Sequence, residues 1–381
     1  MTEPVDSFIV RGQHGRTDVY GNITAFGIPG IAPPGRLAFV APPYGEWRLF
    51  LLARSSSEWI LTNDVLAAVA FPEFASADVT VISPGDIVAV RNDEWDLLPK
   101  DPPGRPPEMI QSIAALEHAV AGVDTALRYE TCQIVARRRP LRLLLSGGVD
   151  SGLLASHLWE QQADVVALTV RTPWGDEIEG ATRTANHVGI PVDIVDVTAD
   201  ELVAAIPRCM RLLQTADAET IAIHVLITLA FESAAAVDAD LVTGLGSDLL
   251  NARSDVGMAT TSSDIGERIR SASASGLMCT AERSTGSRIF HPYWSPHMIY
   301  TQLSVPSVMK EAEGIDKYYL RRLASHRLPE ANAYGKKVAI HEGSGLVRGL
   351  ERHIGQSLEE HCARTWEHLM RNAAQVMERA R

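Results

Sequence analysis

The spacing of hydrophobic positions divides the chain into two parts, and the first ends near residue 98. Short apolar or alternating runs in this part are separated by Gly and Pro clusters, which is typical of β-strands joined by tight turns. The runs occupy residues 8–10, 37–40, 47–52 and 86–90, and a short capped helix is predicted at 63–70. Residues 1–98 are therefore predicted to form a mostly β domain.

The second part, residues 109–381, alternates between helical periods and short buried strands. A helix is predicted over residues 109–136, and the strand-like runs that follow lie at 141–145, 165–170, 192–197 and 240–244. Helix-length segments separate these runs, so successive strands require crossover connections. The pattern predicts an α/β domain with a parallel sheet. Residues 99–108, which are rich in proline, predict a stiff linker before it.

A glycine loop follows the first predicted strand of this sheet. After Leu145 the chain reads Ser146-Gly147-Gly148-Val149-Asp150-Ser151, and a helical pattern begins there. Backbone N–H groups of such a turn, together with the helix dipole, favour an anion. A carboxylate in this cradle would repel a bare phosphate, and a Mg²⁺ ion between them removes the conflict. We therefore expect a metal-bound polyphosphate here; the alternative is a helix capped by Ser146 with an incidental Asp150.

A second glycine turn follows the last predicted strand and also carries an aspartate. Its sequence is Thr243-Gly244-Leu245-Gly246-Ser247-Asp248. Ligands of open α/β sheets bind at the carboxyl ends of strands, so Asp150 and Asp248 are predicted to meet over one Mg²⁺ ion. The alternative is a glycine turn in which Asp248 only caps the backbone.

Composition narrows the class of protein. The 381 residues carry a net charge of −12, which argues against a broad surface for nucleic acid or anionic membrane. Neither an apolar run long enough to span a bilayer nor a secretory signal is recognised, and the four cysteines lack metal-type spacing. A cytoplasmic protein with free thiols is expected.

The loop at 146–151 resembles the PP-loop of the ATP pyrophosphatases, which cleave ATP between the α and β phosphates. Asp176-Glu177, Ala181 and the second glycine turn are similar to the synthetase domain of the asparagine synthetase class B family. Three further stretches resemble its β-lactam and carbapenam synthetase branch: His291-Pro292-Tyr293-Trp294, Asp316-Lys317-Tyr318-Tyr319-Leu320-Arg321, and the nine residues from Lys337 to Gly345.

This resemblance implies an AMP-forming ligase that uses ATP and Mg²⁺. A small carboxylic acid would be adenylated and its acyl group transferred to an amine-type nucleophile, in specialised metabolism. Lys317 is expected to hold the β and γ phosphates, and Lys337 to contact pyrophosphate and then stabilise the tetrahedral oxyanion. Val170 is expected to line the adenine pocket. The other nucleotide-binding residues are expected to be Leu145, Ser146, Gly147, Gly148, Asp150, Ser151, Gly244 and Gly246.

Two departures from the family pattern change the expected chemistry. Residue 2 is Thr2 rather than the cysteine of glutamine-using members, so a glutaminase activity is not expected. The β domain is instead expected to be a reduced glutaminase-like scaffold, or a surface for a homodimer. The branch carries a catalytic Tyr at the position of Leu245, which has no proton to exchange. Glu282 lies close to the expected position of that tyrosine's partner and is a candidate substitute.

Three functions remain open on the sequence. The leading one is an amide- or lactam-forming ligase. The second is intermolecular amidation with free ammonia, a carrier-bound amine or a peptide amine. The third is a catalytically inactive nucleotide-binding partner protein, against which the retention of Asp150, Asp248 and Lys337 argues. A sulfur-transferring tRNA enzyme is disfavoured by the acidic charge and by the absence of paired cysteines.

Overall fold

The structure is a computed structural model that describes residues 8–13, 16–20, 36–91, 94–98, 116–251, 262–280, 286–335 and 345–379. The predicted linker, residues 99–108, lies outside the described residues. The proposed domain boundary therefore stays a prediction. Below, residues 8–98 are called the N-terminal β region and residues 116–379 the α/β region.

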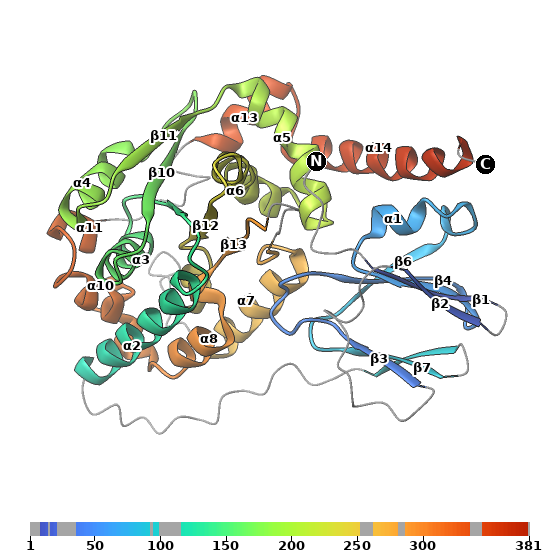
Figure 1. The fold of residues 1–381 in the computed structure, drawn as a ribbon, viewed down its shortest axis with the longest axis horizontal. Helices are drawn as coiled ribbons and strands as arrows, with labels where there is room; N and C mark the ends of the chain where they lie inside the picture. The colour runs from blue at the N-terminus through green and yellow to red at the C-terminus, as the bar shows by residue number, and fades with distance from the viewer. Residues whose placement is uncertain are drawn as a thin grey trace.

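The N-terminal β region contains two antiparallel sheets, which Figure 1 shows as stacked layers. The first has the order β2-β1-β5-β4-β6 and the second the order β3-β7-β8. Phe8, Phe39, Leu51 and Val88 belong to one core cluster between the sheets, so the alternating runs of the sequence bury one face of each sheet. The strands are β1 (Ile9–Gln13), β2 (Arg16–Tyr20), β3 (Arg36–Val40), β4 (Leu49–Ser55), β5 (Glu58–Thr62), β6 (Asp78–Ile82), β7 (Ile87–Arg91) and β8 (Glu94–Leu98).

The predicted short helix of this region is α1 (Val65–Val69), which the 3-10 turn η2 (Pro72–Phe74) follows. Its N-cap is Asp64, whose side chain accepts a hydrogen bond from the N–H of Ala67. The C-terminal helix α14 (Leu358–Arg379) packs against α1 through Trp366 and Met370, and Figure 1 shows it running over the β region. The end of the chain therefore contributes to the core of the N-terminal β region.

The α/β region is built on a five-stranded parallel sheet, which confirms the predicted fold class. Its order is β11-β10-β9-β12-β13, so the chain adds strands on one side of β9 first and on the other side afterwards. The strands are β9 (Leu141–Leu144), β10 (Val165–Arg171), β11 (Val192–Asp196), β12 (Asp240–Thr243) and β13 (Ile289–Phe290). The sequence pattern missed β13, because two residues are too few to show a period.

Helices cover both faces of this sheet. Leu141, Leu143 and Leu145 face a cluster that includes α2 (Leu116–Val135), α3 (Val149–Glu160) and α4 (Ile178–Val188). Leu144 faces the opposite cluster, which includes α5 (Ala199–Leu213), α6 (Ala218–Ala236) and α13 (Leu346–Ile354). The apolar run before the glycine loop thus supplies both cores of a three-layer α/β/α arrangement.

The remaining described elements complete the α/β region after β12. They are η3 (Ser247–Leu250), α7 (Ser262–Ser275), η5 (Pro292–Trp294), α8 (Pro296–Leu303), α9 (Ser307–Lys310), β14 (Glu311–Ala312), β15 (Ile315–Asp316), α10 (Tyr318–Ala324) and α11 (Glu330–Ala333).

Among the described residues, α6 is the one helix long and apolar enough to cross a membrane by length and composition. In the most apolar window of this helix, 67% of the residues are buried inside the protein. Its position in the core, where it packs against β9, β10 and β12, accounts for this hydrophobicity.

Candidate active site at the carboxyl edge of the parallel sheet

Strands β9 and β12 are neighbours in the sheet and point the same way, with Leu144 paired to Thr243 at their ends. The order of the sheet reverses between them, because later strands are added on the β12 side. A crevice is expected at such a reversal, outside the carboxyl ends of the strands. The two glycine turns of the sequence follow these two strands and therefore meet at the switch point.

The loop at residues 146–151, called the PP-loop for the motif it resembles, leaves β9 and approaches α4 closely. Gly147 has a φ of 72°, and a Cβ added there would lie 2.4 Å from the carbonyl carbon of Gly180. Any side chain at this position would therefore collide with backbone and adopt a left-handed conformation. The Nδ2 of Asn332 donates to the carbonyls of Gly147, at 2.7 Å, and Gly180, at 3.0 Å, and so holds the two segments together.

Helix α3 begins at Val149, and its N-cap is Gly148, which makes no side-chain capping hydrogen bond. The alternative that Ser146 caps this helix is therefore wrong. The hydroxyl of Ser146 instead lies 3.1 Å from that of Ser151, whose Oγ accepts a hydrogen bond from the N–H of Ser146. The helix presents its positive end with serine hydroxyls beside it, which suits a phosphate group.

Asp150 lies in the first turn of α3 and is 4% exposed. One carboxyl oxygen accepts from the hydroxyl of Ser247 at 2.7 Å, and the other lies 2.5 Å from the Nζ of Lys317. The hydroxyl of Tyr293 donates to the main-chain carbonyl of Asp150 at 3.1 Å. Burial and the negative charge of Asp150 raise the pKa of Tyr293 well above its usual value, so this phenol stays protonated and keeps donating.

The second glycine turn brings Asp248 to the same place. The main chain of Ser151 lies against Gly244, where an added Cβ would be 3.2 Å from its nitrogen. Gly246 has a φ of 99° at the start of η3, and an added Cβ would be 2.9 Å from the Trp294 ring. The turn thereby places a carboxyl oxygen of Asp248 2.5 Å from the Nζ of Lys317.

Lys317 therefore joins the two aspartates. Its side chain is 2% exposed and its ammonium lies between the buried carboxylate of Asp150 and that of Asp248, which is 52% exposed. A buried ammonium is costly unless carboxylates compensate it, and here it offsets two that would otherwise repel each other. The structure thus brings together three residues that are distant in the sequence.

The donor set of this site is compatible with Mg²⁺. Within the described ranges no group of three or more His, Cys, Asp and Glu side chains converges to form a complete protein cage. Magnesium commonly binds through one or two carboxylates together with substrate phosphates and water. Asp150 and Asp248 would be the protein ligands, and the cation would polarise phosphoryl oxygens and neutralise a leaving pyrophosphate.

The positions of the other predicted site residues say less about their roles. Val170 lies near the end of β10 and is 7% exposed within the cluster beneath α6, so it borders the carboxyl edge of the sheet. Leu145 is 1% exposed, and its N–H donates to the carbonyl of Leu168. Lys337 and Glu282 lie outside the described residues, so their predicted roles are untested.

Sequence reasoning missed three residues that hold the site together: Ser247, Tyr293 and Asn332. The first two stand inside motifs that were recognised, so the motifs marked the stretch without revealing the contact. Asn332 follows Pro329 at the start of a short helix, and nothing near it in sequence points to the PP-loop.

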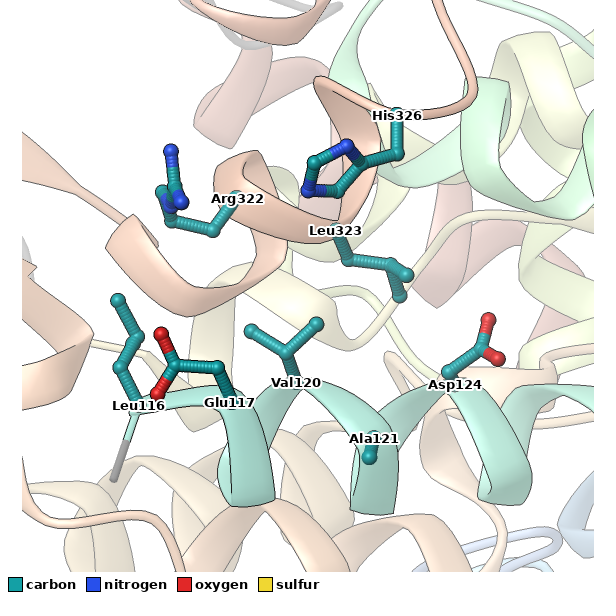
Figure 2. A pocket seen from close by; sticks show the side chains of 8 residues that line it. All are labelled: Leu116, Glu117, Val120, Ala121, Asp124, Arg322, Leu323 and His326. Atoms are coloured by element: carbon teal, nitrogen blue, oxygen red, sulfur yellow. The ribbon is translucent and has the colours of Figure 1, made fainter.

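A cavity with a volume of about 170 Å³ lies elsewhere, between α2 and α10. Figure 2 shows side chains of α2 on one side and, on the other, Arg322, Leu323 and His326. None of the predicted site residues lines this cavity. The position of the functional site therefore rests on the switch point and its charged residues.

Comparison with known proteins agrees with this position. Residues 130–277, which include both glycine turns, match the protein family described as asparagine synthase. The chain is also 22% identical over 249 residues to a carboxyethyl-arginine β-lactam synthase of Streptomyces clavuligerus. That alignment covers 65% of the chain and 48% of the relative, so the chain spans about half the length of this curated protein.

Two solved structures show weaker likeness. An NMN synthetase from Francisella tularensis has a TM-score of 0.35 and 8% identity, covering 68% of this chain and 93% of that one. An NH₃-dependent NAD synthetase from Campylobacter jejuni has a TM-score of 0.25 and 16% identity, covering 34% of this chain and 56% of that one. At these TM-scores neither likeness bears on the fold, which the sheet order itself defines.

The parallel sheet and the two glycine turns at its carboxyl edge define an α/β architecture. The two sequence matches support a likeness of this region to asparagine synthetase-like and β-lactam synthetase-like proteins.

Proposed function

We propose that the protein is an ATP-dependent, AMP-forming carbon–nitrogen ligase. It would adenylate a small carboxylic acid and transfer the acyl group to an amine-type nucleophile, giving an amide or a lactam. The observation that carries this proposal is the convergence of Asp150, Asp248 and Lys317 at the switch point of the parallel sheet. The match of residues 130–277, which contain both aspartates, to asparagine synthase supports it.

In the first half-reaction a carboxylate oxygen of the acid attacks the α-phosphorus of ATP, and the bond to the bridging oxygen of pyrophosphate breaks. The positive end of α3 and the hydroxyls of Ser146 and Ser151 would bind the phosphates. Asp150 and Asp248 would hold the Mg²⁺ that accompanies them. Lys317 would hold the β and γ phosphates and offset the charge that the departing pyrophosphate acquires.

In the second half-reaction the amine attacks the acyl carbonyl and AMP leaves. Lys337 is proposed to stabilise the tetrahedral oxyanion. The support for this role is the resemblance of the stretch from Lys337 to Gly345 to the family motif, and Lys337 itself lies outside the described residues. Leu245 supplies no base, so the nucleophile must be mostly neutral, lose its proton to the substrate, or use a base elsewhere such as Glu282.

The product and the biological setting are further parts of the proposal. The relative's name specifies carboxyethyl-arginine, which makes carboxyethyl-substituted amino acids the first acids to test. A place in specialised metabolism is proposed on the same likeness. The N-terminal β region is proposed as a scaffold or dimerisation surface, and no nucleic-acid or membrane partner is expected.

The proposal is tested by ATP–pyrophosphate exchange with a panel of small acids, with Mg²⁺ present and absent. Exchange that depends on one acid and on Mg²⁺ supports adenylation. Mass spectrometry of products formed with and without added ammonia or amines then separates lactam formation from intermolecular amidation. Tight ATP binding without exchange for any acid would instead favour the inactive nucleotide-binding protein, and the ligase proposal would be abandoned.

A further inference from the structure

The backbone of Lys317 has a conformation that its side chain does not favour. It is the N-cap of α10, with φ 53° and ψ 33°, in the left-handed region. A non-glycine residue held in a sparsely populated region costs on the order of 1–3 kcal/mol and persists where its surroundings enforce it. Something next to Lys317 must therefore fix the start of this helix.

A buried cluster of polar side chains includes Tyr319, two residues after the lysine. The hydroxyl of Tyr319 is 2.8 Å from the Oδ1 of Asn251 and 2.8 Å from the Oε1 of Gln302. The Nδ2 of Asn251 donates to Gln302 Oε1 at 3.0 Å and to the carbonyl of Ser247 at 2.7 Å. Tyr319, Asn251 and Gln302 are each 0% exposed. Hydrogen bonds in such a dry environment are strong, and losing one leaves buried groups without partners.

The cluster connects the elements that carry the site. Asn251 is the C-cap of η3, which contains Asp248, and Ser247 of the same turn donates its hydroxyl to Asp150. Gln302 belongs to α8, and Tyr319 to the first turn of α10. From Asp150 the contacts run through Ser247, Asn251 and Tyr319 and return through Lys317 to Asp150. This closed ring fixes the lysine relative to both carboxylates.

We propose that Tyr319 is a positioning residue that acts through Lys317. Its hydroxyl, bonded to Asn251, holds the start of α10 so that Lys317 keeps its left-handed backbone and aims its ammonium between Asp150 and Asp248. Burial raises the pKa of Tyr319 well above its usual value, so the phenol remains a donor. The role in catalysis rests on the proposed function, whereas the role in positioning concerns the protein without substrate.

The experiment uses the full chain and the variant Tyr319→Phe, which removes one hydroxyl and keeps the ring. Tyr129→Phe, on a residue that is 51% exposed, is the matched control. The chain has five lysines: Lys100, Lys310, Lys317, Lys336 and Lys337. Lysine labelled with ¹³C at Cε therefore gives a simple NMR spectrum, in which Lys317 is assigned by comparison with Lys317→Met.

In Tyr319→Phe we expect the Lys317 signal to shift and broaden because the ammonium leaves its fixed position, while the Lys310 signal stays in place. Tyr129→Phe should leave both signals unchanged. An unchanged Lys317 signal in folded Tyr319→Phe overturns the proposal. If that variant does not fold, Gln302→Met, which removes the second partner of the tyrosine, is measured with the same criteria. This arm requires no turnover, so it stands even if no acid supports exchange.

The second arm is a double-mutant cycle in pyrophosphate exchange. Tyr319→Phe should lower kcat about tenfold in the wild-type background, as removal of a supporting hydrogen bond commonly does, and leave the KM for ATP within about twofold. In the Lys317→Met background the same change should have almost no further effect. Equal losses in both backgrounds would show that Tyr319 acts independently of Lys317 and overturn the proposal.

Discussion

Two lysines of the α/β region are equally buried and have different surroundings. Lys310 ends α9 and Lys317 precedes α10, and each is 1% exposed. Lys317 lies between two carboxylates. Lys310 donates to the main-chain carbonyl of Leu250, and among the described residues no carboxylate lies within ion-pair distance of it. Burial lowers the pKa of Lys310 to about 7, and the charge of Arg268 adds to this effect.

The comparison shows that burial of a cation does not by itself mark a functional site. Lys310 is enclosed and supports the end of the turn that carries Asp248, because Leu250 belongs to the same η3 element. Lys317 offsets charge at a place where Asp248 is half exposed to solvent. We therefore expect Lys317 to control activity and Lys310 to control the pH dependence of stability.

Lys317→Met should have the largest effect, because it removes the cation next to the phosphates and leaves two carboxylates in mutual repulsion. Pyrophosphate exchange should fall about 100- to 1000-fold, as when a transition-state donor is deleted. Lys310→Met is the matched control and should remain within about fivefold of wild type, because the Lys310 ammonium donates to the main-chain carbonyl of Leu250 and lies outside the pair of aspartates. Similar losses in the two variants would remove the distinction between the lysines.

Asp150→Asn tests the partner of Lys317 that is fully buried. The amide keeps the shape but loses the charge that would hold Mg²⁺, so exchange at a fixed Mg²⁺ concentration should fall about 100-fold. Asp200→Asn, on a side chain that is 92% exposed, should behave as wild type. A full rate in Asp150→Asn would defeat the metal assignment.

Asp248→Asn should have a smaller effect, about tenfold, because the side chain is 52% exposed and water can take the place of one ligand oxygen. The measurement is the Mg²⁺ concentration that gives half-maximal exchange, which should rise. A loss greater than that of Asp150→Asn would mean that the exposed carboxylate is the principal ligand.

Lys310→Met should change the pH dependence of stability and little else. Because the folded pKa of about 7 lies below the ordinary 10.5, the unfolded chain binds one more proton than the folded chain between these values. This group therefore makes the wild-type free energy of unfolding rise by about 1.4 kcal/mol per pH unit in that window. Below the window both states bind the proton, so the stability gained at high pH is fully lost there and the slope vanishes. Urea unfolding from roughly pH 7.5 to 9.5 should show a flatter profile in Lys310→Met. Parallel profiles would contradict the comparison.

The hydrophobic pattern of the sequence predicted only part of the fold. The hydrophobic period sufficed for the parallel sheet, because strands such as β9 and β10 are long enough to show it and helices separate them. The two-residue β13 and the packing of α14 on α1 were missed, since neither leaves a local pattern. The five-residue strands β2, β5, β6 and β8 were also missed.

For the site, the glycine turns predicted the carboxyl edge of the sheet, and the structure brings Asp150 and Asp248 together there. The motif around Lys317 indicated phosphate binding, but its contact with both aspartates depends on a fold in which α10 packs against α2 and α3. The support from Asn251, Gln302 and Tyr319 was not predictable, because buried amides and phenols have no sequence signature. Lys310 gave no signal at all.

The central claim is that Asp150 and Asp248 hold Mg²⁺ with a polyphosphate at the switch point. A crystal structure with Mg²⁺ and an ATP analogue that resists cleavage between the α and β phosphates tests it most directly. The account predicts a cation in contact with both carboxylates and with phosphate oxygens, the phosphates at the start of α3, and Lys317 bound to the β or γ phosphate. A nucleotide bound elsewhere, or phosphates in the PP-loop with the cation away from both aspartates, would contradict it.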